Sequence, residues 1–375
     1  MFQLARMPQI VSKSTAVVAV VCLGFVVTLS NLALSEERRP ASTEAAESTK
    51  SQRSAPASRY PQLAPLPSTA PAPADNPTTP AKVELGKQLF FDPRLSGNNT
   101  MSCASCHMPD RAMGDGVAWN KGETGVTLVR NTQTILNVGF YARYFWDGRS
   151  DSLEDQALKP IESAVEMNQP LDELERELNE IPGYASQFQS VFGAKPNRGD
   201  TARALAAFQR TLVSGPSPFD RYLLGDENAL SPNAKRGLKL FAGAARCVDC
   251  HHGPHLSDGE FHRIGTSEED EGLAMHSGKS EDRYLFRTPS LRNVADTAPY
   301  MHDGSFHSID EVLEYYYNGT PATTTDGSLP IDAPDLRGRS HADIDYLKAF
   351  LETLSGPLPK VSPPSLPPGP RDKSK

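Results

Sequence analysis

The chain has 375 residues, with 38 basic and 46 acidic side chains and a formal charge of −8, and 38% of its residues are hydrophobic. This composition is sufficient for one or two ordinary soluble cores, and it excludes a collagen, a coiled coil and a polytopic membrane protein. The negative charge also disfavours nucleic-acid binding, because phosphate groups attract basic surfaces.

Residues 1–35 have the pattern of an export signal. Two basic residues precede a continuous apolar stretch at 16–29, and Ala33 and Ser35 supply small side chains at the spacing that a signal peptidase accepts. We therefore expect export, and a periplasmic location. The alternative is an uncleaved membrane anchor, because the apolar stretch approaches the roughly 20 residues that span a bilayer.

Both ends of the remaining chain are rich in proline. Residues 36–80 combine proline with serine, alanine and threonine and contain few large apolar side chains, and residues 356–375 repeat this composition. Such segments bury too little apolar surface to offset the conformational entropy lost on ordering. We predict a disordered tether at 36–80 and a disordered tail at 356–375.

Four of the five cysteines lie in two C-x-x-C-H pentapeptides. In this motif two thiols reach the two vinyl groups of one porphyrin, and the histidine binds its iron. A thioredoxin-like redox pair does not require the histidine, and a zinc site built from both motifs leaves the regular histidine placement unexplained. We therefore predict two covalently attached c-type haems. Their binding residues are Cys103, Cys106 and His107, and Cys247, Cys250 and His251.

The segments that precede the two motifs resemble each other. The pattern G-x-x-L-F occurs before each motif, starting at Gly86 and at Gly237, and each copy lies in an amphipathic helical stretch. Long alternating strand patterns are absent from the sequence. We predict a mainly α fold with two cytochrome-c-like domains, at 81–225 and 226–355.

Histidines are distributed unevenly between the two predicted haem sites, because none lies between His107 and His251. Met108, Met113 and Met167 are the methionines available as a second ligand to the N-terminal iron. A haem with two strong axial ligands transfers electrons, whereas a haem with a vacant position binds peroxide or oxygen. We predict a five-coordinate, reactive N-terminal haem.

A longer series of motifs occurs in order over residues 81–355: Leu85 to His107, Phe145 to Arg149, Gln156 and Ala157, Pro160, Val165 to Asn168, Thr288 to Asn293 and Thr297 to Gly304. This series resembles the bacterial di-haem cytochrome c peroxidase superfamily. The resemblance implies a haem peroxidase that reduces H2O2 at the N-terminal haem and draws electrons through the C-terminal haem. The implied donor is a small cytochrome c or cupredoxin, or an oxidisable protein substrate.

The resemblance also implies roles for individual residues. Glu166 and Gln156, with Pro160 beside them, match the catalytic residues on the open face of the N-terminal haem. A carboxyl group there can take a proton from bound peroxide and return it to the leaving oxygen. Trp146 matches the indole that lies between the two haems and relays electrons.

A bridging calcium ion is also implied by the resemblance. Its ligands map to the side-chain oxygen of Asn131 and to the backbone carbonyl oxygens of Thr297 and Pro299. Oxygen ligands suit this hard cation. The sequence shows no acidic cage, so this expectation rests on the resemblance alone.

Two departures from the classical peroxidases favour the MauG-like branch of the superfamily. The region that aligns with their distal histidine, from Val117 through Trp119 to Glu123, contains no histidine. Where they have a methionine on the C-terminal iron, this chain has Tyr316. Tyr317 and Met301 are the alternative ligands that remain open.

Two other functions remain open. A non-catalytic di-haem electron-transfer cytochrome would have two six-coordinate irons, and a sensor would use the open haem for a diatomic ligand. Glu166 argues against a sensor, because gas binding needs no proton shuttle. The sequence names no partner, so the choice between a cytochrome c peroxidase and a protein-modifying oxidase is also open.

Overall fold

The structure is a computed structural model that describes residues 59–334 and 336–369. The predicted leader at 1–35, and the predicted tether as far as residue 58, lie outside the described residues. The described residues all belong to one compact unit. Within its described part, no helix has the length and apolar character needed to cross a bilayer.

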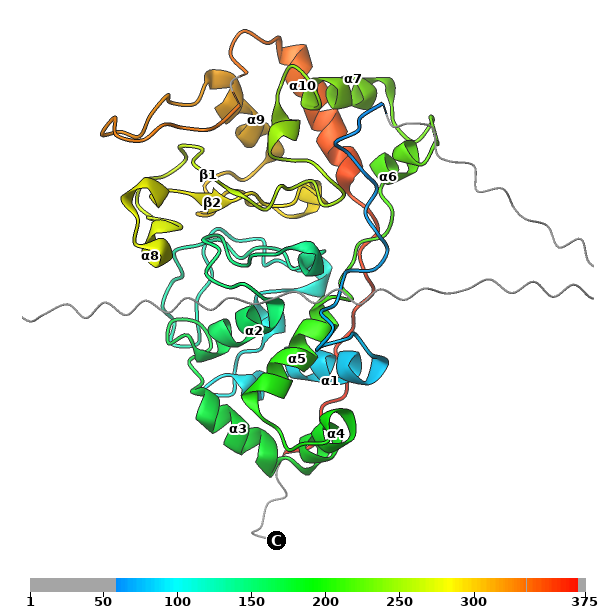
Figure 1. Ribbon diagram of the computed structural model, residues 1–375, viewed down its shortest axis with the longest axis vertical. Helices are drawn as coiled ribbons and strands as arrows, with labels where there is room; N and C mark the ends of the chain where they lie inside the picture. Colours follow the sequence, from blue (N-terminus) through cyan, green and yellow to red (C-terminus); the bar gives the residue numbers. More distant parts are fainter. Residues whose placement is uncertain (1–58, 335, 370–375) are drawn as a thin grey trace, which may run out of the picture. The chain divides into compact units, whose positions relative to one another are not determined.

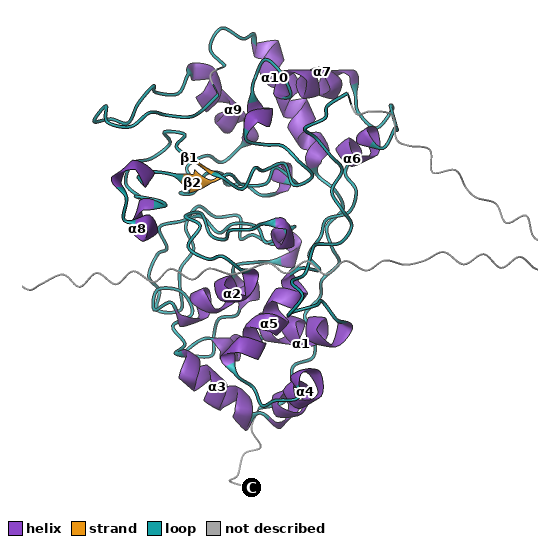
Figure 2. Ribbon diagram, viewed as in Figure 1, coloured by secondary structure: helices purple, strands orange, loops and turns teal. Residues whose placement is uncertain are grey.

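Helices make up most of the regular structure (Figure 2), as predicted. The only strands in the described residues are β1 (Phe261–His262) and β2 (Phe286–Arg287), which pair antiparallel. The helices are α1 (Pro80–Phe91), α2 (Leu153–Glu162), α3 (Leu171–Glu180), α4 (Pro182–Phe192), α5 (Arg198–Gln209), α6 (Pro218–Leu223), α7 (Pro232–Phe241), α8 (Ala274–Ser277), α9 (Ile309–Asn318) and α10 (His341–Leu351).

The first core forms around the crossing of α1 and α5 (Figure 1). Gly86 makes this crossing close, because a Cβ atom added to it would lie 1.9 Å from the carbonyl oxygen of Ala204. The rings of Phe90 and Phe208 pack beside the crossing, with their centroids 5.2 Å apart. The side chains of the other helices of this half, α2 to α4, complete the core.

The second core repeats this arrangement with α7 and α10 (Figure 1). A Cβ atom added to Gly237 would lie 1.8 Å from the carbonyl oxygen of Tyr346, and the ring centroids of Phe241 and Phe350 are 5.0 Å apart. The repeated G-x-x-L-F pattern therefore marks two equivalent helix crossings. Each crossing supports one C-x-x-C-H motif, which confirms the prediction of two cytochrome-c-like halves.

Side-chain caps define where these helices begin. Thr79 and Ser231 accept hydrogen bonds from backbone N–H groups of the first turns of α1 and α7, and each is followed by a proline at the first helical position. Ser340 forms a capping box with Asp343 at the start of α10. The same short sequence signals thus start the equivalent helices of both halves.

The proline-rich segment before α1 differs from its prediction over residues 59–80. Leu63 is buried in the second core and forms a parallel bridge with Gly253. Asn76 is 1% exposed and donates hydrogen bonds to Glu154 Oε1 and the Arg203 carbonyl oxygen. The prediction of disorder was wrong here because a few anchoring contacts order an extended segment, and average composition does not reveal them.

The tail differs from its prediction in the same way over residues 356–369. The carbonyl oxygen of Pro357 accepts a hydrogen bond from the Gly215 N–H at 2.8 Å, and that of Pro367 accepts one from Arg94. Val361 packs against the first core. The segment leaves the last helix of the second half and lies along the first half, so its order depends on contacts distant in sequence.

Candidate functional site

Each C-x-x-C-H motif forms one turn of 3-10 helix, at Cys103–Ser105 and at Cys247–Asp249. The backbone N–H of each motif histidine donates to the carbonyl oxygen of the first cysteine at 2.9 Å, in both halves. None of these four cysteines forms a disulfide within the described residues. One turn of this helix therefore presents two thiols and an imidazole together, as attachment of a porphyrin requires.

The two motif imidazoles are oriented by the same kind of contact. His107 Nδ1 lies 3.1 Å from the carbonyl oxygen of Met113, and His251 Nδ1 lies 3.1 Å from that of Leu256. A donor at Nδ1 leaves Nε2 available for a metal. Burial lowers the pKa of both histidines, that of His251 to about 4, which favours the neutral ring that binds iron.

Two of the three methionines near the first motif belong to the first core. Met113 and Met167 are buried there, whereas Met108 is half-buried. The backbone carbonyl of Met113 orients His107, a role that the sequence did not reveal. Both Met113 and its counterpart Leu256 have positive φ angles, 59° and 53°, which turn these carbonyl groups toward the imidazoles.

Arg287 is a buried cation whose partners are all neutral. It is 3% exposed, and its guanidinium stacks on the ring of Tyr141 at 3.6 Å. Within the described residues no carboxylate lies at ion-pair distance from it, and a buried unpaired charge is costly. Its hydrogen-bond acceptors are Gln133 Oε1 and the carbonyl oxygens of Phe145 and Thr288.

His255 is also buried, and one of its ring nitrogens has no hydrogen-bond partner. It is 6% exposed, and its Nε2 makes no hydrogen bond. Burial, and then the positive charges of Arg287 and Arg292, lower its pKa to about 3. Both His255 and Arg287 pack on Tyr141, so an anion with acceptor oxygens satisfies them together. A haem carries two such carboxylates, and the residues present therefore fit this cofactor.

The turn that follows α2 brings Glu166 back toward the first motif. The carbonyl oxygens of Pro160 and Ser163 accept hydrogen bonds from the N–H groups of Met167 and Glu166, which folds the turn onto the end of the helix. Burial raises the pKa of Glu166 against the opposing effects of Arg149 and Ser163. Gln156 lies one helical turn before Pro160, on the same face of α2.

The charge of Glu166 reaches the first motif. Burial, Asp115 and Glu166 together raise the pKa of the Cys106 thiol to about 11. The interaction between two charges grows as they approach each other. The structure therefore places Glu166 near enough to the first motif to act on Cys106, although the two lie far apart in sequence.

A loop without histidine covers the Glu166 turn. A Cβ atom added to Gly122 would lie 1.8 Å from the Val165 carbonyl oxygen, and the Glu123 N–H donates to the Glu166 carbonyl oxygen at 2.7 Å. The carboxylate of Glu123 accepts hydrogen bonds from the Asn98 N–H and the Asn168 side chain. Glu123 thus fastens the loop.

Trp146 lies where the two halves meet. Its indole N–H donates to the Asn131 carbonyl oxygen at 3.0 Å, and its own carbonyl oxygen accepts from the Arg287 N–H at 2.8 Å. The neighbouring Asp147 forms ion pairs with Arg130 and Arg149. Trp146 is therefore held by contacts from the first half and from β2 of the second half.

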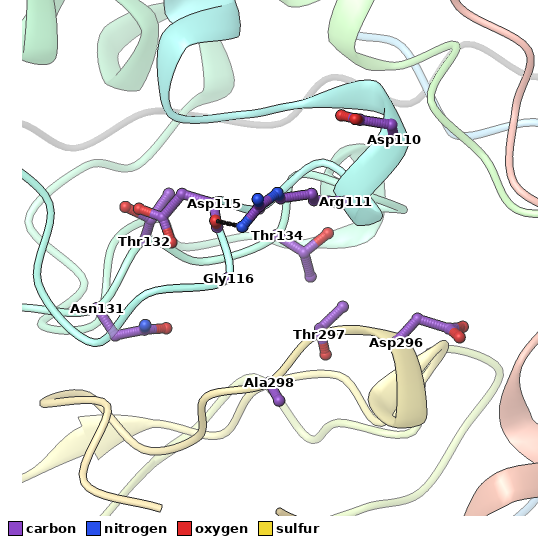
Figure 3. Close-up of a pocket in the computed structure, with 11 residues that line it drawn as sticks. Asp110, Arg111, Asp115, Gly116, Asn131, Thr132, Thr134, Asp296, Thr297 and Ala298 are labelled. Carbon is purple, nitrogen blue, oxygen red and sulfur yellow. Dashed lines mark hydrogen bonds between the residues drawn. The ribbon is translucent and has the colours of Figure 1, made fainter. Parts of the chain in front are cut away.

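Two of the three candidate calcium ligands line a cavity of about 360 Å³ between two loops (Figure 3). Asn131 comes from the first half, and Thr297 faces it from the second. The Asn131 side-chain N–H donates to the Val117 carbonyl oxygen, which leaves its Oδ1 free for a cation. Pro299 follows the lining residue Ala298. Three acidic side chains that the sequence gave no reason to group also line the cavity: Asp110, Asp115 and Asp296.

The three consecutive tyrosines of α9 have different surroundings. Tyr316 packs against the second core, and burial, Cys247 and Cys250 raise the pKa of its hydroxyl. Within the described residues that hydroxyl makes no hydrogen bond. Tyr315 donates to the Ile264 carbonyl oxygen, and the Tyr317 hydroxyl lies 3.5 Å from His341 Nε2. The structure thus favours Tyr316 over Tyr317 as the residue beside the second motif.

Each motif has a polar pair beside its second cysteine. Asn120 donates to Cys106 Sγ at 3.4 Å and to Asp115. In the second half, ligand atoms of Cys250, Asp258 and His262 lie within 4.8 Å of one another. Three such groups resemble a metal site, but a cysteine that carries a haem is not a free ligand, and the Asn120 group shows the same arrangement.

The chain is similar to known proteins over most of its length. Residues 80–228 match the family model for di-haem cytochrome c peroxidase. The chain is 43% identical over 300 residues to the methylamine utilization protein MauG of Methylorubrum extorquens, covering 78% of this chain and 83% of that protein. It is 41% identical over 329 residues to the cytochrome-c peroxidase IdrP1 of a Pseudomonas species, covering 78% and 86%.

A solved structure shows the same fold. The crystal structure of a MauG-like protein associated with microbial copper homeostasis superposes with a TM-score of 0.70 at 31% identity, covering 79% of this chain and 94% of that one. Sequence and structural similarity thus extend over both halves. The chain belongs to the di-haem cytochrome c peroxidase family, whose members are haem-containing oxidoreductases.

Proposed function

We propose that the chain is an exported peroxidase that carries one covalent c-type haem on each C-x-x-C-H motif and reduces H2O2 in its N-terminal half. The bound haems would supply iron that takes up peroxide and transfers electrons. The observation that carries this proposal is Glu166, a half-buried carboxyl group near the first motif, under a loop that offers no competing histidine.

Glu166 would manage the protons of the reaction. Its raised pKa brings the carboxyl closer to neutrality, where one group can both accept and return a proton. The peroxide O–O bond breaks as two electrons and two protons are taken up, and two water molecules leave. Gln156 lies on the face of α2 that also carries Pro160, and its carboxamide would hold the peroxide by hydrogen bonding.

The second half would supply the electrons. His251 and Tyr316 would bind its iron, and a phenolate ligand favours the oxidised metal. Trp146, which is hydrogen bonded to both halves, would relay electrons between them. The donor would be a small cytochrome c or cupredoxin, or an oxidisable side chain of a protein substrate. The net charge of −8 suits a basic donor by favouring encounter.

Two further parts of the proposal rest on the sequence. Export to the periplasm follows from the pattern of residues 1–35, with a membrane anchor as the alternative if that segment is not cleaved. A calcium ion would bind at Asn131, Thr297 and Pro299, where the nearby acidic side chains add favourable charge.

Electron paramagnetic resonance of the resting ferric protein tests the proposal. One high-spin and one low-spin ferric signal are expected, and the high-spin signal should change after one equivalent of H2O2. Two low-spin signals that do not change after H2O2 is added would instead indicate an electron-transfer cytochrome. Rapid turnover with reduced cytochrome c identifies a cytochrome donor, whereas slow turnover with a long-lived oxidised state identifies a protein substrate.

A further inference from the structure

The loop that covers the Glu166 turn carries an exposed apolar surface. Trp119 is 58% exposed, and three valines of the same loop are also exposed. The Leu128 N–H donates to the Asn120 carbonyl oxygen, so the two sides of the loop that carry Trp119 and Val129 lie next to each other. Exposed apolar side chains that gather in this way can mark contact with another molecule. We call this cluster the 117–129 surface, and its members are Val117, Trp119, Val126 and Val129.

Trp119 is next to a residue that contacts the first motif. The Asn120 side chain donates to Cys106 Sγ at 3.4 Å, and Asp115 holds that side chain through a hydrogen bond of 2.9 Å. The exposed Trp119 is therefore adjacent in sequence to Asn120, whose side chain contacts Cys106. Cys106 would carry the N-terminal haem.

Two hydrogen bonds through Asn131 also connect the backbone near Trp119 to Trp146, the only other tryptophan in the sequence. The Val117 carbonyl oxygen accepts from the Asn131 side chain at 2.9 Å. The Asn131 carbonyl oxygen accepts from the Trp146 indole at 3.0 Å. The segment 117–120 is thus bonded both to the first motif and to the candidate relay between the halves.

The backbone around Trp119 is held in place. A Cβ atom added to Gly304 would lie 2.7 Å from Ala118 Cα, so the two backbones are in contact. The Leu128 N–H donates to the Asn120 carbonyl oxygen at 2.8 Å and closes the loop. The exposed indole is therefore presented to solvent from a fixed backbone.

We propose that Trp119 is a surface electron-transfer residue, through which an oxidisable redox protein docked on the 117–129 surface donates electrons directly to the N-terminal half. This route rests on the proposed peroxidase function and bypasses the C-terminal haem. The occupant is a protein, because the apolar side chains spread along an exposed loop and do not enclose a small molecule. It presents an apolar contact face around its own one-electron centre.

The electron balance of this route is simple. The peroxide-oxidised N-terminal half takes one electron from Trp119, and the indole N–H proton passes to water, which reaches this exposed side chain. The docked protein then loses one electron to the indole, and a proton from water restores the N–H group. Two such cycles deliver the two electrons that one H2O2 molecule consumes.

Spin trapping of the di-haem protein tests the route without a partner. The holoprotein receives one equivalent of H2O2 with a nitroso spin trap and no donor, and tryptic peptides are mapped by mass spectrometry. An adduct is expected on the peptide that contains Trp119, and Trp119→Phe should abolish it. Adducts confined to Trp146 or to tyrosines would overturn the proposal.

Kinetics with a small basic reduced cytochrome c as the probe give the second test. Trp119→Phe keeps an apolar ring but should slow cytochrome oxidation severalfold, and Trp119→Tyr, which restores an oxidisable ring, should recover it. Val129→Thr should raise KM for the cytochrome and leave the Trp119 adduct intact. Equal rates in wild type and Trp119→Phe would overturn the proposed route.

The optical spectrum distinguishes a failure of the peroxidase function from a failure of the Trp119 route alone. If peroxide leaves the haem spectrum of the wild type unchanged, the peroxidase function fails and the Trp119 route fails with it. If the spectrum changes normally but no adduct forms on Trp119, only the route fails.

Discussion

The indole N–H of Trp146 donates a hydrogen bond to the backbone carbonyl oxygen of Asn131 at 3.0 Å. Asn131 also lines the cavity that holds the candidate calcium ligands, and its backbone N–H donates to the His302 carbonyl oxygen at 2.7 Å. The candidate electron relay and a candidate metal ligand therefore share one residue. An ion bound at Asn131 is expected to fix the position of Trp146.

Calcium removal should therefore slow electron transfer between the halves. Chelation of the wild type, or Asn131→Ala, is expected to reduce the rate by about tenfold, because small misplacements of a reacting group cost up to about 10²-fold in rate. Stopped-flow spectroscopy gives the rate, and isothermal titration gives calcium affinity. Asn228→Ala, at an exposed site, is the control. A chelated wild type with unchanged kinetics would remove the cation from this role.

Glu166→Gln should impair the reaction with peroxide. The amide keeps the size of the side chain but cannot shuttle a proton, so a rate loss of about 10² to 10⁴ is expected. Both haems should stay attached, because Glu166 is not part of either motif. The rate of the spectral change after mixing with H2O2 is the measurement. Glu162→Gln, at the exposed end of α2, should behave as wild type, and equal rates in both variants would refute the role of Glu166.

Tyr316→Phe and Tyr317→Phe should differ in their effect on the C-terminal iron. Tyr316 lies among the second-core residues near Cys247 and Cys250, whereas Tyr317 contacts His341. Removal of the Tyr316 hydroxyl is therefore expected to abolish the low-spin ferric signal, and removal of the Tyr317 hydroxyl to preserve it. The reverse pattern in electron paramagnetic resonance would identify Tyr317 as the ligand of the C-terminal iron.

Gly86→Ala and Gly237→Ala should each destabilise one half of the protein. The added methyl group meets a backbone carbonyl oxygen at a helix crossing, where the partner cannot move away. A loss of about 1 to 3 kcal/mol in the free energy of unfolding is typical of such overpacking. Scanning calorimetry of the holoproteins measures it.

Gly199→Ala is the matched control for these two substitutions. Gly199 lies exposed in the first turn of α5, with only the Asn197 side chain near the added Cβ atom. Alanine there should leave stability unchanged, or raise it by up to about 1 kcal/mol through helix propensity. A loss equal to that of Gly86→Ala would show that the crossing geometry is not the cause.

The pH dependence of stability should report the ion pair of His262. Its ring nitrogens lie 2.8 Å from Asp258 and 2.9 Å from Asp332. Hydrogen bonding to Asp258, and also to Asp332, raises the pKa of His262 well above its ordinary value. Because the folded pKa exceeds the unfolded value of about 6.5, this contribution to stability is complete below pH 6.5 and is lost as the pH rises through the folded pKa.

Thermal unfolding of the wild type and His262→Gln between pH 6 and pH 10 measures this contribution. The difference in Tm should be largest near the acidic end and should shrink as the pH rises. A difference that stays constant over the whole range would show that His262 acts through packing and not through its charge.

The spacing of residues within short motifs was sufficient to predict haem attachment and the two equivalent halves. The C-x-x-C-H motifs predict haem attachment because one short turn fixes the relative positions of two thiols and an imidazole, whatever surrounds them. The repeated G-x-x-L-F pattern likewise indicated two equivalent helices, since a helix crossing as close as those at Gly86 and Gly237 requires glycine. The ordered series of motifs then identified the family.

Other features depend on contacts between segments distant in sequence, and only the tertiary structure decided them. Stacking on Tyr141 beside the buried His255 distinguishes Arg287 from the other arginines, and the packing of α9 on the second core distinguishes Tyr316 from its two neighbours. The proline-rich ends are ordered by single anchors such as Leu63. Burial and pairing are properties of three-dimensional surroundings, which a one-dimensional pattern does not contain.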